Sequence, residues 1–163
     1  MTALPKTILA FALFAATPVV AAELPAAIAA PDAATVATFR AEGAQIYECK
    51  AGTDGKLAWQ FREPVAALLS DGKTVGRHYV GPSWEHVDGS AVTAKTTGTA
   101  PGATAKDIAW LKLSVTANRG TGILTGVTTV QRINTQGGKL EGPCDKAGAL
   151  QSAGYAADYV FLK

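Results

Sequence analysis

The densest group of chemically versatile side chains lies between residues 77 and 88. It combines both histidines of the chain with two carboxylates, a guanidinium group and two aromatic rings: Arg77, His78, Tyr79, Trp84, Glu85, His86 and Asp88. If Gly81 and Pro82 turn the chain back on itself, His78 and His86 approach each other with a carboxylate nearby. Zinc and copper accept such ligands. The spacing matches no recognised metal motif such as H-E-x-x-H, so a metal at these histidines is the alternative interpretation.

The same group favours the binding of an organic ligand. Aromatic faces stack on sugars and other flat molecules, and neighbouring polar groups hydrogen-bond to them. We therefore predict that a carbohydrate or another small molecule is bound by Arg77, His78, Tyr79, Trp84, Glu85 and Asp88. Further rings and polar groups that could line such a groove are Tyr47, Trp59, Trp110, Gln131, Asn134, Tyr155 and Tyr159. The competing interpretation places the tryptophans in the hydrophobic core, where large aromatic rings are commonly found.

Patterns typical of catalysis are weaker. Ser83 lies in a near match to the G-x-S-x-G nucleophile motif, but the final glycine is missing. Glu85 and Asp88 could form a glycosidase pair, yet carboxylates this close in sequence beside a turn are usually solvated. We assign no catalytic residue and no cofactor. The sequence favours a non-catalytic binding module over a small metal-binding protein or enzyme centred on His78 and His86.

The N-terminus has the three-part pattern of a secretory signal peptide. Lys6 precedes an apolar run at residues 8–16, and small residues follow up to Ala22. The run is shorter than the ~20 apolar residues that a membrane-spanning helix needs. We predict cleavage after Ala22, a mature chain without a transmembrane segment, and a periplasmic or secreted location.

Charge and length limit the possible partners of the mature chain. Removal of the 22 signal residues leaves 141 residues with 14 basic and 13 acidic side chains, because the signal holds one lysine and no carboxylate. The basic residues are scattered, whereas nucleic-acid binding requires them to be clustered. The length suits one domain with one core. We therefore exclude nucleic acid as a partner, and the sequence does not indicate an oligomeric state.

The chain contains two cysteines, Cys49 and Cys144. Outside the cytosol, cysteines pair by default, and no redox C-x-x-C motif is present. We predict a disulfide between them. The alternative is a pair of unlinked thiols, because spacing alone does not bring two sulfur atoms together.

Apolar residues alternate with polar ones along several short segments after residue 43. Glycine, proline and Asp-Gly turns separate these segments, and no long helical pattern intervenes. We predict one all-β domain over residues 43–163, either an antiparallel β-sandwich or a closed barrel, with Pro64 ending one strand. Residues 23–42 are rich in alanine and are predicted to form an extended or partly helical lead-in. Arg132 and Asp158 are expected to form a partly buried ion pair.

Several motifs are shared with a known family. They are GAQIYEC at residues 43–49, GRHYVGPSWEHVDGS at 76–90, IAWL at 108–111, GVTTVQRINT at 126–135 and ADY at 157–159. In these motifs the chain resembles the domain of unknown function 3455 family of secreted bacterial and fungal proteins. The resemblance covers nearly all of the mature chain. It implies export and a single domain, and it supplies no activity or cofactor.

Overall fold

The computed structural model of the chain describes residues 23–163. The predicted signal peptide at residues 1–22 lies outside the described residues. Within the described part, no helix has the length and apolar character that crossing a membrane requires.

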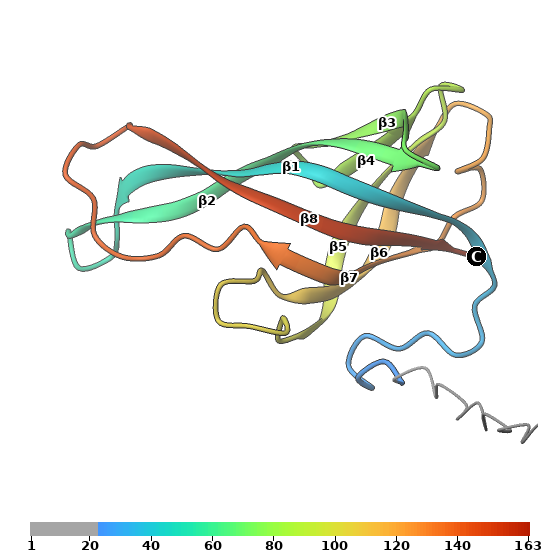
Figure 1. Cartoon of the computed structure of the whole chain (residues 1–163), viewed down its shortest axis with the longest axis horizontal. Coiled ribbons are helices and arrows are strands. Elements are labelled where there is room, and N and C mark those ends of the chain that lie inside the picture. The colour runs from blue at the N-terminus through green and yellow to red at the C-terminus, as the bar shows by residue number, and fades with distance from the viewer. Residues whose placement is uncertain (1–22) are drawn as a thin grey trace, which may run out of the picture.

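Eight antiparallel strands form a closed barrel in which each strand pairs with its sequence neighbours and the last pairs with the first (Figure 1). This arrangement confirms the all-β prediction and decides between sandwich and barrel. The strands are β1 (Thr35–Ala51), β2 (Leu57–Ser70), β3 (Lys73–Tyr79), β4 (Ser83–His86), β5 (Ala91–Ala100), β6 (Trp110–Arg119), β7 (Thr129–Gly137) and β8 (Leu150–Leu162).

The up-and-down order gives the barrel two different ends. The connections that follow β2, β4 and β6 lie at one end, which we call the closed end, and those that follow β1, β3, β5 and β7 lie at the other, the open end. Phe39, Phe161 and Val130 point inward near the closed end and are each at most 4% exposed. Leu124 and Val127 of the β6–β7 loop join this cluster. The loop thus plugs the closed end with apolar side chains.

Strand β1 begins at Thr35, so the boundary expected between residues 42 and 43 falls inside a strand. Phe39 and Ala41 are buried and alternate with more exposed neighbours. The alternation is hard to recognise because alanine, which is a poor strand former, occupies several of these positions. Within residues 23–163, the lead-in to the barrel therefore comprises residues 23–34.

This shorter lead-in is fastened to the outside of the barrel wall. Ile28 is fully buried, and its carbonyl oxygen accepts a hydrogen bond of 2.6 Å from the Gln131 amide. Lys112 donates to the Ala29 carbonyl at 3.1 Å. Gly98 of β5 provides the space, because a Cβ atom there would collide with the lead-in backbone. Gln131 therefore anchors the lead-in instead of lining a ligand groove.

Strands β1, β2 and β8 are longer than the others and extend together beyond the open end (Figure 1). Pro64 does not end a strand, contrary to expectation, because β2 runs on to Ser70. The pairing of β2 with β3 starts only at Ala66, so one side of β2 has no neighbouring strand at Pro64. A missing N–H is tolerated at such an edge position, next to the bulge opposite Ile46.

The predicted disulfide between Cys49 and Cys144 is confirmed, with the two Cα atoms 5.9 Å apart. It joins β1 to the β7–β8 loop. The backbone on either side is also bound, since Cys144 donates to the Leu57 carbonyl and Gly148 donates to the Cys49 carbonyl. The bond therefore holds this loop across the extended strands at the open end.

Loss of the disulfide should destabilise the fold without changing its topology. For the double variant Cys49→Ser and Cys144→Ser we expect the free energy of unfolding to fall by up to about 4–5 kcal/mol, because the bond closes a loop of 95 residues. Urea unfolding followed by circular dichroism measures the change. Reduced wild-type protein is the control and should match the variant. Equal stability of the oxidised protein and the variant would show that the bond does not constrain the unfolded chain.

Candidate ligand-binding cavity

A cavity of about 1070 Å³ occupies the barrel at the open end. Its rim comes from three of the connections at that end: Gly81 and Pro82 after β3, residues 101–109 after β5, and residues 139–141 after β7. Tyr47 of β1 and Phe61 of β2 contribute the wall beneath the extended strands. The barrel is therefore filled at one end and hollow at the other.

Apolar side chains supply most of the cavity wall. Those on β2, β6 and the loop before β6 are Phe61, Pro64, Ile108, Leu111 and Leu113. Leu111 and Leu113 point inward because they stand two residues apart on one strand, and side chains alternate between the two faces of a strand. Such a wall removes apolar ligand surface from water, which is the main source of affinity for small organic molecules.

Three packed aromatic rings form the boundary between the cavity and the filled half of the barrel. The His78 ring lies parallel to the Trp84 ring with 4.6 Å between centroids, and the Tyr159 ring packs against both at 4.8 and 5.2 Å. His78 and Trp84 face each other directly across the β3–β4 pair, and all three residues line the cavity. They form a rigid aromatic floor.

His78 is held in a single neutral form. Its Nδ1 lies 2.8 Å from the Ser83 carbonyl oxygen, which can only accept, so Nδ1 carries the proton. Burial lowers the pKa of His78 from its ordinary 6.5 to about 3, and the nearby positive charge of Arg132 acts in the same direction. At neutral pH, Nε2 is therefore an unprotonated hydrogen-bond acceptor.

Arg132 projects from β7 into the cavity. It stands opposite Leu111 and Tyr159 on the two neighbouring strands, so it shares their inward face. Its Nε donates to the Ala109 carbonyl oxygen at 3.0 Å. The expected ion pair with Asp158 is wrong, because Asp158 follows the outward register and bonds instead to Arg40 at 3.2 Å.

Two hydrogen bonds order the loops at the rim. The Tyr47 hydroxyl donates to the Gly138 carbonyl at 2.8 Å, and the Asp107 carboxylate accepts from the Gly137 backbone N–H at 2.6 Å. The bonds from Gly137 and Thr104 hold the pKa of Asp107 below its usual value. The first ties the start of the β7–β8 loop to β1, and the second ties the end of β7 to the β5–β6 loop.

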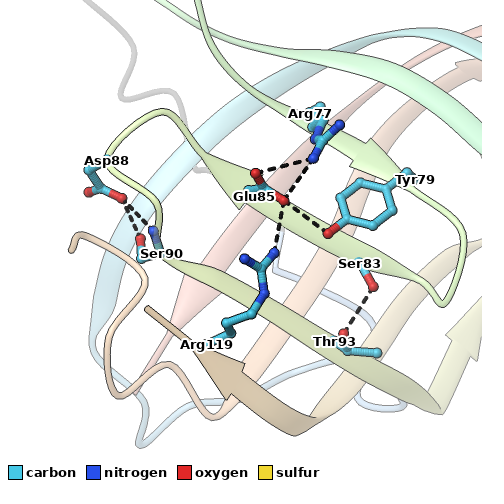
Figure 2. A network of polar contacts seen from close by, with 8 residues as sticks. All are labelled: Arg77, Tyr79, Ser83, Glu85, Asp88, Ser90, Thr93 and Arg119. Atoms are coloured by element: carbon cyan, nitrogen blue, oxygen red, sulfur yellow. Dashed lines mark hydrogen bonds and ion pairs between the residues drawn. The ribbon is translucent and has the colours of Figure 1, made fainter. Parts of the chain in front are cut away.

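The strand alternation divides the predicted ligand-binding group between two faces. His78 and Trp84 point into the barrel, whereas Arg77, Tyr79 and Glu85 lie on the outside. Figure 2 shows the outer three converging with Arg119 of β6. Glu85 Oε2 accepts from Arg77 at 3.1 Å, from Arg119 at 2.9 Å and from the Tyr79 hydroxyl at 3.1 Å. These bonds lower the pKa of Glu85. The polar groups of this surface network are thus bonded to one another.

Asp88, the remaining member of that prediction, lies at the closed end. Its carboxylate accepts from the Ser90 hydroxyl and backbone N–H (Figure 2). It also accepts from the Ile123 backbone N–H at 2.7 Å. These bonds hold its pKa well below the usual range. Asp88 thus fastens the β6–β7 plug to the β4–β5 turn, at the opposite end from the cavity.

The two histidines share the inward face but have different neighbours. His86 stacks on Phe39 with 5.6 Å between centroids, and its Nδ1 lies 3.0 Å from Asp88. Among residues 23–163, no group of three or more histidine, cysteine, aspartate or glutamate side chains could hold a metal ion. The geometry gives the metal hypothesis no further support.

The wider groove predicted from aromatic residues is only partly assembled. Tyr47, Trp84 and Tyr159 line the cavity. Trp59 and Trp110 are half-buried and stand apart from the cavity wall, and the exposed Asn134 side chain bonds to Asp158 on the outer face. Tyr155 is buried and does not line the cavity, and its hydroxyl lies 3.5 Å from that of Tyr159. Arg132 was not among the predicted site residues, although it stands two residues after Val130 on one strand and therefore shares its inward face.

The fold is a closed antiparallel barrel with a lined cavity at one end, an architecture that can hold one small ligand. Residues 29–163 match the family model described as a protein of unknown function (DUF3455), and the chain belongs to this family. The match spans every strand of the barrel. No curated protein and no solved structure matches the chain. The family description assigns no activity, so a functional proposal has to start from the cavity.

Acid should destabilise the protein through His78. Because its pKa is about 3 when folded and near 6.5 when unfolded, only the unfolded chain binds this proton between the two values. The contribution is complete above pH 6.5, and the free energy of unfolding falls as the pH drops below it, by up to about 1.4 kcal/mol per pH unit.

The variant His78→Asn tests this because an asparagine amide can donate to the Ser83 carbonyl but does not titrate. We expect urea unfolding between pH 6.5 and 4.5 to show a smaller pH slope in this variant than in wild type. Leu113→Ala is the control, because it removes a buried apolar side chain and no titratable group, and it should keep the wild-type slope. An unchanged slope in His78→Asn would contradict the assignment of this proton to His78.

Proposed function

We propose that this protein is an exported, non-catalytic binding protein that holds one small organic molecule, apolar over most of its surface and containing a ring, inside the barrel. The observation that carries the proposal is the cavity of about 1070 Å³ at the open end, with its aromatic floor. Export is supported by the signal-peptide pattern and by the disulfide, which is typical of oxidising compartments.

Size and wall chemistry both support this ligand class. Pockets for small organic molecules commonly measure roughly 300–1,000 Å³ and combine a mainly apolar wall with a few polar groups that orient the ligand. Here the apolar part is provided by Leu111, Leu113 and Phe61, and the polar part by His78, Arg132 and Tyr159. The three rings of the floor pack on one another and add aromatic surface to the cavity wall.

The same features favour an apolar ligand over a glycan. A sugar presents hydroxyl groups on its edges, and burying them requires many hydrogen-bonding partners. The predicted glycan-facing residues Arg77, Tyr79 and Glu85 are bonded to one another on the outer face. Their polar groups are already satisfied, so the inner face is the better candidate surface.

A bulky side chain placed in the cavity should block binding. Ala109 lines the cavity beside Arg132, and Ala109→Trp would place an indole in the ligand space. The probe is N-phenyl-1-naphthylamine, a neutral compound that fluoresces strongly in apolar surroundings. We expect saturable binding to wild type, and at least about a tenfold weaker Kd for the variant, equivalent to about 1.4 kcal/mol.

The matched control is Ala117→Trp, the same substitution at an exposed position of β6 outside the cavity. It should leave the Kd for the probe within about twofold of wild type, well under 1.4 kcal/mol. Absence of saturable binding to wild type, or equal weakening by both variants, would refute binding in the cavity.

A further inference from the structure

We propose that the ligand is an organic anion whose carboxylate is bound by Arg132. This inference rests on the proposed function and narrows its ligand class. It starts from the charges around the cavity, where an apolar wall and an arginine head group meet.

Arg132 differs from the other cations that line the cavity. Arg62 is paired with Glu63 at 3.1 Å, and Lys139 is paired with Glu141 at 3.1 Å. No carboxylate in the described part of the chain lies within salt-bridge distance of Arg132. Its guanidinium group is therefore the cation in the cavity whose charge the described residues leave uncompensated.

The hydrogen bonds of Arg132 leave the right donors free for an anion. Nε donates to the Ala109 carbonyl, which fixes the plane of the head group. The Tyr159 hydroxyl is a further hydrogen-bonding neighbour of the guanidinium group, and no carboxylate within residues 23–163 pairs with it. A guanidinium group binds a carboxylate through two parallel N–H bonds, so an arginine held by Nε still presents an Nη pair.

The carboxylates nearest the cavity are occupied elsewhere. Asp107 accepts from the Gly137 backbone and from Thr104, and Glu141 pairs with Lys139 in an exposed position. Neither offsets the positive charge next to the aromatic floor. His78 stays neutral there, partly because of Arg132. The interior is thus electrostatically suited to an anion and unsuited to a cation.

The combined geometry defines the ligand in chemical terms. Its ring system would pack on the floor formed by His78, Trp84 and Tyr159, and its carboxylate would face Arg132 on the same side of the barrel. Charge-assisted hydrogen bonds inside an apolar wall are stronger than in water, because the local dielectric is lower. An aromatic carboxylic acid fits this description.

A matched pair of probes tests the inference. Naphthalene-2-carboxylate and naphthalene-2-carboxamide share a ring and a shape but differ in charge. We expect wild type to bind the carboxylate at least about tenfold more tightly than the carboxamide, as measured by quenching of tryptophan fluorescence. Arg132→Gln should remove this preference while leaving carboxamide affinity within about twofold of wild type.

Two further variants keep the test interpretable. Arg132→Lys retains the charge without the planar fork and should keep part of the preference for the carboxylate. Arg119→Gln removes a cation from the outer face and should change neither affinity, which excludes a general effect of net charge.

The outcomes separate this inference from the function on which it rests. Equal wild-type affinity for the two naphthalenes, or equal weakening of both by Arg132→Gln, would overturn the role of Arg132. Binding of N-phenyl-1-naphthylamine without any binding of the carboxylate would overturn the anion inference and leave the cavity function intact. Failure of all three probes would overturn both.

Discussion

The aromatic floor of His78, Trp84 and Tyr159 divides the interior of this barrel. On its closed-end side, Phe39, Phe161 and the β6–β7 plug fill the space, and on its open-end side the barrel is hollow. The floor stays in place because the His78 ring is held by the Ser83 carbonyl and is neutral. A charged imidazole at this position would be destabilised, because it would be buried without a paired anion. The neutral histidine is therefore a condition for the cavity as well as for the core.

The rest of the molecule supports this division. Asp88 holds the plug at the closed end, and the disulfide at Cys49 holds the β7–β8 loop across the open end. The lead-in packs on the outer wall through Gln131 and leaves the cavity free. The loops at the open end thus form the rim of the cavity, and the strands form its floor. In such an arrangement a rigid scaffold of strands positions the loops.

Local pattern in the sequence predicted the strands and their turns well but could not predict how they close. The hairpin of β1 and β2 follows from alternation and from the Asp-Gly turn at residues 54–55. Pairing of β1 with β8 joins segments more than 100 residues apart, and no local signal specifies it. The start of β1 was not predicted because alanines obscure the alternation of apolar and polar residues there. Pro64 was wrongly predicted to end a strand, because a missing backbone N–H interrupts a sheet only where a neighbouring strand would pair with it.

The candidate site was partly predictable by the same reasoning. The group at residues 77–88 was noticed for its composition, but the period of two separates His78 from Arg77 and assigns them to opposite faces. Residues that are adjacent along a strand therefore do not belong to the same site, because their side chains point to opposite faces. If the ligand binds to the inner face of the barrel, nuclear Overhauser effects will connect bound naphthalene-2-carboxylate to Trp84, Leu111 and Tyr159 of labelled protein. Contacts confined to Tyr79 and the outer wall would contradict binding inside the barrel.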